Sequence, residues 1–275
     1  MIRIGAQVSV SGGFQQTIEE AHDMELRCLQ IFSRSPVGGQ SRGLPQPNQM
    51  AQWLAGAHIR PLFVHAPYFV NPAATDRAMH DRACQVLGEE MLRVKQLAGD
   101  FLVIHPGHRQ AGAEENQARQ AFAQTIVYLL SKPGRILIEN TAGQGKEIGS
   151  DFEDLGIIFN IIGRSSRVGA MVDTAHAMAV GYPLKTTDDW HRLTDVLEST
   201  VGLARIRGIH LNDTVFPVGS RRDRHAALLT GDLGPGALKG ILASAQQHQW
   251  PLILETPGKS ARERANDIAI LSDLI

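Results

Sequence analysis

Short apolar runs of strand length alternate with longer amphipathic segments along the whole chain. The apolar runs predict strands at Ile2–Gln7, Cys28–Phe32, Leu62–His65, Phe101–His105, Arg135–Glu139, Val168–Asp173, Ile206–His210 and Pro251–Glu255. The amphipathic segments predict helices at Phe14–Met24, Met50–Ala57, Asp76–Leu97, Glu114–Leu130, Phe152–Ile162, Asp188–Val201, Ala237–Gln247 and Ala261–Leu274. Eight strand–helix units in 275 residues favour a (β/α)8 TIM barrel.

A doubly wound open sheet is the alternative fold. Its phosphate-binding Gly-x-Gly-x-x-Gly pattern does not follow the first predicted strand. The chain also has no low-complexity tract, charge block or shift in composition that would mark a domain boundary. We therefore expect residues 1–275 to form a single barrel domain.

Six of the eight predicted strands end on a residue that can bind a metal ion. These residues are His65, His105, Glu139, Asp173, His210 and Glu255. In a barrel of parallel strands these ends lie on one rim, the face where active sites are built. A lone histidine at a strand end is more often structural, but converging imidazoles and carboxylates are costly to bury unless something neutralises them. The pattern predicts a metal site.

Three further candidate ligands lie just beyond strand ends. His176 follows Asp173 by three residues, a spacing that places both side chains on one side of a tight turn. Asp223 and His225 are two residues apart, so in an extended loop their side chains project the same way. Nine ligands are too many for one ion and fit two or three that share a bridging carboxylate. Imidazole and carboxylate favour zinc, with Mn²⁺ an alternative at the oxygen-rich positions.

Composition and charge bear on whether the protein binds nucleic acid, is secreted or crosses a membrane. A formal charge of −1 gives no global basic signature of a nucleic-acid binder, although bound divalent ions would add positive charge at one place. Cys28 and Cys84 lie in apolar segments and are expected to be buried, reduced thiols. The first residues are too short an apolar run for a signal peptide, and no window approaches the ~20 apolar residues of a membrane span. We expect a cytoplasmic protein without membrane contact.

The motifs around these residues resemble those of bacterial endonuclease IV, in the family's order and from Gly5 to Pro257. They are His-Ala-Pro-Tyr-Phe-Val-Asn at 65–71, His-Pro-Gly at 105–107, Glu-Asn-Thr-Ala-Gly-Gln-Gly at 139–145, Asp-Thr-Ala-His-Ala at 173–177, Gly-Tyr at 181–182, His-Leu-Asn-Asp at 210–213, Gly-Ser-Arg at 219–221, Asp-Arg-His at 223–225 and Leu-Glu-Thr-Pro at 254–257.

The resemblance implies an abasic-site endonuclease of DNA base excision repair, a deoxyribonuclease with three zinc ions per chain. The implied ligands are His65, His105 and Glu139 for the first ion, Glu139, Asp173, His210 and Glu255 for the second, and His176, Asp223 and His225 for the third. Glu139 would bridge the first two ions.

Paired ions suit phosphodiester hydrolysis because they lower the pKa of a bound water to about 7 and clamp the attacking and leaving oxygens. We predict that a hydroxide between the first two ions attacks the phosphate 5′ to the abasic site, giving a 3′-hydroxyl and a 5′-deoxyribose phosphate. Glu139 and Glu255 are the predicted catalytic carboxylates, and Glu139 is the candidate for orienting or deprotonating the water. Removal of 3′-blocking groups is expected as a second activity.

Duplex DNA with abasic sites is the expected partner, positioned by the rim loops through phosphate contacts and an aromatic side chain. The candidate contacts are Tyr68, Arg34, Arg221, Arg222 and Arg224, with Arg42 and Lys146 as further loop candidates. No obligate protein partner is implied, and a monomer is expected.

The sequence departs from the family pattern in three places. The loop after the second strand reads Arg34-Ser-Pro-Val-Gly-Gly39 and lacks the usual Lys-Asn, Arg and Trp that meet DNA at the lesion. Gln7 stands where a histidine is usual, and residues 226–231 read Ala-Ala-Leu-Leu-Thr-Gly in place of His-Ser-Leu-Gly-Glu-Gly. These changes leave the metal ligands intact and concern lesion recognition.

Two other functions fit part of the pattern. A single-metal sugar isomerase or epimerase on the same barrel would need only Glu139, Asp173, His210 and Glu255, so the other five ligands argue against it. A metal-stabilised DNA-binding protein without turnover is the second alternative. A count of bound metals and a nicking assay distinguish the three.

Overall fold

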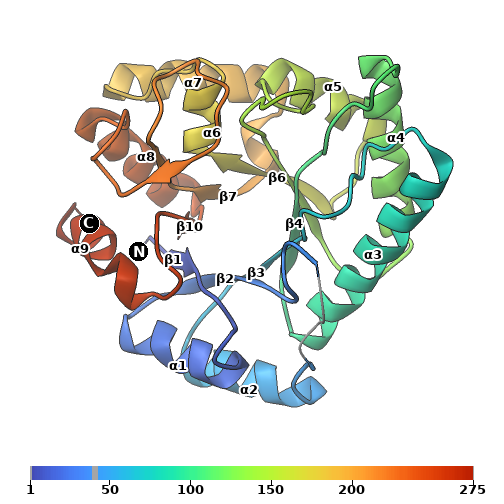
Figure 1. The fold of residues 1–275 in the computed structure, drawn as a ribbon. Helices are drawn as coiled ribbons and strands as arrows, with labels where there is room; N and C mark the ends of the chain where they lie inside the picture. The colour runs from blue at the N-terminus through green and yellow to red at the C-terminus, as the bar shows by residue number, and fades with distance from the viewer. Residues whose placement is uncertain (1, 39–42, 275) are drawn as a thin grey trace.

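The computed structural model describes residues 2–38 and 43–274. In this part of the chain eight parallel strands close into a barrel, seen end-on in Figure 1. They are β1 (Ile4–Gln7), β2 (Cys28–Phe32), β3 (Leu62–His65), β4 (Phe101–Ile104), β5 (Ile136–Glu139), β6 (Val168–Asp173), β7 (Ile206–His210) and β10 (Leu252–Leu254), which pairs with β1. The predicted (β/α)8 barrel is confirmed.

Helices surround the barrel (Figure 1). They are α1 (Phe14–Asp23), α2 (Pro47–Gly56), α3 (Arg77–Gln96), α4 (Glu115–Leu129), α5 (Phe152–Ile162), α7 (Thr187–Thr200), α8 (Pro235–His248) and α9 (Ala265–Leu274). Each coincides with a predicted helix, except that the last begins as a separate 3-10 turn, η2 (Arg262–Arg264). No helix in the described ranges is long and apolar enough to cross a membrane.

The chain forms additional elements that the apolar pattern did not predict. Helix α6 (Thr174–Ala179) follows β6 directly, a 3-10 turn η1 (Leu203–Arg205) precedes β7, and the loop after β7 contains a hairpin of β8 (Asp213–Thr214) and β9 (His225–Ala226). The tight turn expected after Asp173 is wrong in detail, because Asp173 caps α6 by accepting a hydrogen bond from the His176 N–H at 2.8 Å.

The interior of the barrel holds an apolar layer beneath the strand ends. It consists of Cys28, Phe63, Phe101, Val103, Leu137, Met171 and Ile253, all buried. Phe63, Leu137 and Met171 each precede a candidate ligand by two residues, so both side chains of each pair lie on the same face of the strand. The candidate ligands therefore lie above an apolar floor. Cys28 and Cys84 are free and buried, as predicted.

Gly5 in β1 shows how closely this interior is packed. A Cβ at Gly5 would lie 2.2 Å from the Cys28 carbonyl oxygen and 2.7 Å from its Sγ. We expect Gly5→Ala to cost about 3 kcal/mol and to lower the melting temperature by roughly 10 °C, measured by circular dichroism. Gly56→Ala is the matched control, because a Cβ there meets nothing within 4 Å. Equal melting temperatures for the two variants would contradict this account of the packing.

Candidate metal centre

The nine predicted ligands converge at the carboxyl ends of the strands. Three groups have ligand atoms that all lie within 4.8 Å of one another: His65, His105 and Glu139; Glu139, Asp173, His210 and Glu255; and Asp173, His176 and His225. Glu139 belongs to two of these groups, and so does Asp173. The structure thus brings together side chains from the ends of β3, β5, β6 and β7, from α6 and from the loop after β7. His105 and Glu255 were predicted to end their strands, but each lies one residue beyond, after β4 and β10.

Glu139 is the hub of this arrangement. One oxygen, Oε2, lies 3.1 Å from His65 Nε2 and 3.5 Å from His105 Nε2. The other, Oε1, lies 2.7 Å from His210 Nδ1 and 3.6 Å from His176 Nδ1. The side chain is completely buried. A carboxylate with two oxygens facing different groups of imidazoles has the geometry of a ligand shared by two ions.

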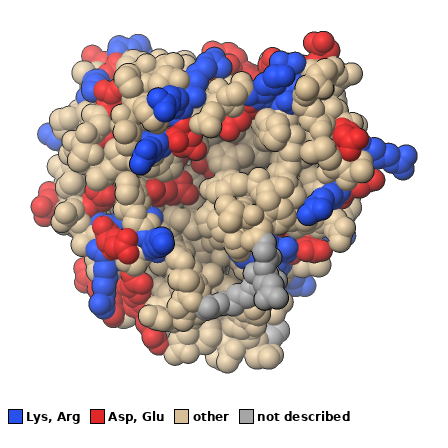
Figure 2. Space-filling view, viewed as in Figure 1, with Lys and Arg blue, Asp and Glu red and all other residues tan. Residues whose placement is uncertain are grey.

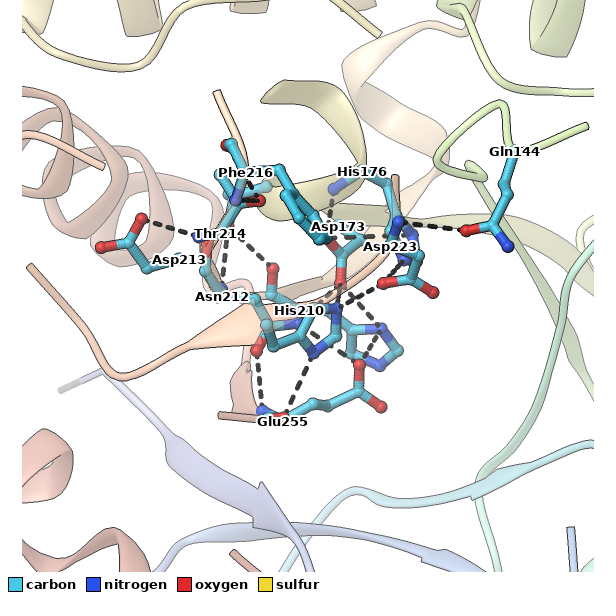
Figure 3. A network of polar contacts seen from close by, with 12 residues as sticks. Gln144, Asp173, His176, His210, Asn212, Asp213, Thr214, Phe216, Asp223 and Glu255 are labelled. Carbon is cyan, nitrogen blue, oxygen red and sulfur yellow. Dashed lines mark hydrogen bonds and ion pairs between the residues drawn. The ribbon is translucent and has the colours of Figure 1, made fainter. Parts of the chain in front are cut away.

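Asp223 completes the third group and lies between His176 and Gln144 (Figure 3). Its Oδ1 lies 3.4 Å from His176 Nε2 and 3.5 Å from His225 Nε2, and its backbone N–H donates to Gln144 Oε1 at 3.3 Å. Asp223 is exposed, whereas His176 is buried. The third group therefore joins a strand-end helix to a surface loop.

Asp213 anchors that loop at both ends. Its fully buried carboxylate accepts hydrogen bonds from the N–H groups of Thr214, Gly231 and Leu233, at 2.7 to 2.8 Å. The segment between these anchors carries Asp223 and His225. The loop is consequently held at its base, while its outer residues face solvent.

Orphaned imidazole nitrogens show that metal ions fit these residues. His105 Nδ1, His176 Nε2 and His225 Nε2 are buried and have no hydrogen-bond partner within the described ranges. Buried polar atoms in folded proteins are normally satisfied, and each exception needs an explanation. His176 Nε2 and His225 Nε2 face the Asp223 carboxylate, and imidazole nitrogens beside a carboxylate match the donor set of zinc or a similar divalent ion.

Backbone carbonyl groups orient three of the histidines. The Nδ1 atoms of His65, His176 and His225 lie 2.8, 2.9 and 3.2 Å from the carbonyl oxygens of Ala66, Asn140 and Glu255. A carbonyl oxygen only accepts, so Nδ1 carries the proton in each ring and Nε2 is left to face the carboxylates. Such outer contacts fix the tautomer and ring orientation of metal-binding histidines.

Two asparagines hold the carboxylate ligands in a similar way. Asn140 exchanges two hydrogen bonds with the backbone of Asp173, at 2.7 and 3.1 Å. Asn212 donates to Asp173 Oδ2 at 2.6 Å and accepts from the Glu255 N–H at 2.8 Å. Both asparagines lie inside the family motifs of the sequence. They were not predicted as site residues, because the prediction considered only histidine and carboxylate residues at or just beyond the ends of strands. The fully buried Gln30, two residues before the end of β2, was missed for the same reason.

The carboxylates set the charge of the histidines they surround. Burial lowers the pKa of His210, but Glu139 and its neighbours outweigh this and raise it to about 9. Burial also opposes the charge of His176, yet Asp173 and the other nearby carboxylates hold its pKa well above 6.5. For His105 the effect of burial is larger than that of the nearby Glu139 carboxylate, and it lowers the pKa to about 4. Without metal, His176 and His210 are therefore protonated at neutral pH and His105 is neutral.

Metal binding is therefore expected to release protons from His176 and His210, because a ligand nitrogen must be deprotonated. We expect chelator-stripped protein to release protons on zinc addition at pH 7, measured with an indicator dye in weak buffer. The release should shrink as the pH rises through about 9, and the apparent affinity should increase with pH up to that point. His191→Gln, an exposed helix histidine, is the control and should not change the release. Zinc binding without proton release at pH 7 would show that His176 and His210 are not protonated in the metal-free protein.

Tyr68 lies beside the candidate ligands. Its side chain is exposed, and its ring centroid lies 5.2 Å from that of His65 and 6.1 Å from that of His105. A cavity of about 180 Å³ opens there, lined in part by Tyr68, His105, His176 and Asp223. Figure 2 shows this face of the molecule hollowed near its centre, with acidic surface close to the hollow and basic side chains beside it.

The candidate DNA-binding arginines lie in two different settings. Arg221, Arg222 and Arg224 are exposed on the loop that carries Asp223, with the Arg222 guanidinium 3.7 Å from the Phe216 ring centroid. Their DNA contacts remain predictions.

Arg34 is instead turned inward. It forms ion pairs with Glu89 and the fully buried Glu90, so the structure gives it an intramolecular role and its DNA contact stays a prediction. Lys146 is exposed on the loop after β5. Arg42 and Gly39 lie outside the described residues.

Comparisons with known proteins match the fold and the sequence of this chain. A family model described as a xylose isomerase-like TIM barrel matches residues 15–273. The probable endonuclease 4 of Moorella thermoacetica is 33% identical over 280 residues, covering 99% of each chain. That of Halorhodospira halophila is 35% identical over 265 residues, covering 94% of this chain and 89% of the relative. The structure of endonuclease IV from Thermus thermophilus matches with a TM-score of 0.83 and 28% identity, covering 99% of this chain and 98% of that one.

Proposed function

This chain belongs to the endonuclease IV family, and from that membership we propose that it hydrolyses the phosphodiester 5′ to abasic sites in duplex DNA. The observation that carries the proposal is the joined set of three ligand groups, with Glu139 shared between two of them. The products would be a 3′-hydroxyl and a 5′-deoxyribose phosphate, and the same site would release 3′-blocking groups. We assign the protein to the cytoplasm and expect it to act as a monomer.

Three divalent ions, zinc at most positions, would be held by the nine residues described above. When bound, they would supply Lewis-acid charge at the phosphate and an activated water. Glu139 would fix the spacing of the first two groups through its two oxygens, and Glu255 would complete the second group. The described residues fit these ions because His176 Nε2 and His225 Nε2, which are buried without a hydrogen bond, face the Asp223 carboxylate.

The chain's own side chains would bind and orient the DNA. The exposed Arg221, Arg222 and Arg224 surround Asp223, where they would contact backbone phosphates near the third group. Tyr68 is exposed beside His65 and His105, where its ring would contact the nucleotide next to the lesion. The apolar floor beneath the ligands would exclude water from the side facing the barrel interior.

The rival on this fold is a single-metal sugar isomerase or epimerase. Its site would need Glu139, Asp173, His210 and Glu255 and nothing from the loop after β7. The approach of Asp223 to His176 and His225 therefore favours the nuclease.

The decisive experiment is incubation with a duplex that carries one tetrahydrofuran abasic-site analogue. We expect nicking 5′ to the analogue, loss of nicking after chelation and recovery with zinc or Mn²⁺, with about three metals per chain by elemental analysis. The same duplex without the analogue is the control and should stay intact. About one metal and no nicking would support the isomerase, whereas three metals and tight binding without nicking would support a DNA-binding protein.

A further inference from the structure

Gln30 lies in β2, one of the two barrel strands, with β1, whose ends offer no candidate metal ligand. Its side chain is completely buried and contacts two candidate ligands of the same group. Gln30 Nε2 lies 2.6 Å from Glu255 Oε1, and Gln30 Oε1 lies 2.8 Å from His210 Nε2. One amide thus joins β2 to β7 and β10 across the barrel interior.

The direction of these hydrogen bonds follows from the partners. The carboxylate of Glu255, as a metal-binding group, can only accept, so the NH₂ group of Gln30 must face it. The amide oxygen then faces His210 and accepts a hydrogen bond from Nε2–H. His210 therefore keeps its proton on Nε2, and Nδ1 is turned toward Glu139 at 2.7 Å and Glu255 Oε2 at 3.3 Å.

This contact distinguishes His210 from the histidines held by backbone carbonyls. His65, His176 and His225 carry the proton on Nδ1 and present Nε2, whereas His210 presents Nδ1. Each of the first three rings donates its Nδ1–H to a different backbone carbonyl oxygen. Within the described part of the chain, the Gln30 side chain is the acceptor found at His210 Nε2.

We propose that Gln30 is a positioning residue of the second metal site, which selects Nδ1 of His210 as a ligand atom and orients Glu255 so that Oε2 faces the site. The inference rests on the proposed metal-dependent function. The Gln30 amide group donates a hydrogen bond to Glu255 Oε1 and accepts one from His210 Nε2. These are the atoms of the two ligands that do not face the site. A carboxylate at position 30 would repel Glu255, and an apolar side chain would remove the hydrogen bonds that Gln30 makes to Glu255 Oε1 and His210 Nε2.

Gln7 provides an internal comparison. It is paired in register with Gln30 on the adjacent strand β1, and its Oε1 is also buried. Yet that oxygen has no hydrogen-bond partner among residues 2–38 and 43–274. The two glutamines are paired in register, but Gln30 is completely buried and hydrogen-bonded to two candidate ligands, whereas Gln7 is only partly buried.

The test compares Gln30→Leu with Gln7→Leu in the full chain. Each protein is loaded with zinc, dialysed against graded chelator and assayed for metals per chain by elemental analysis. We expect Gln30→Leu to weaken one site by about 10- to 100-fold and leave the other two unchanged, while Gln7→Leu matches the unmodified protein. The cobalt-loaded Gln30→Leu protein should also show an altered visible absorption spectrum, a signature that a purely structural role would not change.

Two outcomes would overturn the inference: Gln30→Leu retains zinc as Gln7→Leu does, or all of its sites weaken together. If circular dichroism shows that Gln30→Leu does not fold, the unbranched Gln30→Met variant takes its place under the same criteria. Failure of the proposed function would be distinguishable from failure of this inference. If the function is wrong, the unmodified protein does not nick the tetrahydrofuran duplex, but Gln30→Leu still loses one metal selectively.

Discussion

Glu139→Gln is expected to lose two of the three bound metals and to lower nicking by a factor on the order of 10⁴. The reason is the position of Glu139 between two groups of imidazoles, with Oε2 toward His65 and His105 and Oε1 toward His210. A neutral amide keeps the shape of the side chain but offers one weak acceptor oxygen in place of two charged ones. Elemental analysis and the tetrahydrofuran nicking assay measure the two effects.

Two further variants test whether the loss of two metals is specific to Glu139. Glu255→Gln should also abolish nicking but should lose only one metal, because Glu255 belongs to a single group. Glu147→Gln is the matched control, since Glu147 lines the adjacent cavity but belongs to none of the three groups. It should retain three metals. If Glu139→Gln retained three metals as well, Glu139 would not be the shared ligand.

Asp223→Asn is expected to lose one metal and to lower nicking by roughly 10²- to 10³-fold without unfolding the barrel. The carboxylate lies 3.4 Å from His176 Nε2 and 3.5 Å from His225 Nε2, where it would hold the proposed third ion. Its side chain is 48% exposed, and its neutral counterpart should leave the melting temperature within roughly 2 °C.

Asp232→Asn is the control for this second variant. Asp232 lies further along the same loop and pairs with Lys185 at 2.7 Å, away from the three groups. We expect Asp232→Asn to retain all metals. An Asp223→Asn protein with unchanged metal content and nicking would remove the main distinction from a single-metal isomerase.

The site could be predicted from the sequence because parallel strands present their carboxyl ends on one rim. His65, Glu139 and His210 end their strands in the structure as they end their apolar runs in the sequence. The apolar run therefore indicates both where a strand ends and which side chain meets the rim. Their roles as metal ligands remain predictions that the metal counts test.

Side chains that act through contacts across the barrel were harder to predict. Gln30 is an ordinary polar residue inside an apolar run, and only closure of the barrel brings it to His210 and Glu255. Alternation along β2 would have placed Gln30 on the same face as Cys28, but not beside a ligand. The ion pairs of Arg34 with Glu89 and Glu90 depend equally on the packing of α3 against the rim.

The loop after β7 gives the three groups unequal mechanical support. The first two groups are built on strand ends above a close-packed floor, whereas Asp223 and His225 are carried by a loop anchored at its base by Asp213. Ligands on a rigid scaffold lose little conformational entropy when an ion binds, but ligands on an exposed loop must be ordered first. We therefore expect the proposed third ion to be the exchangeable one, last to enter and first to leave, so that its supply would set how much of the protein is fully assembled.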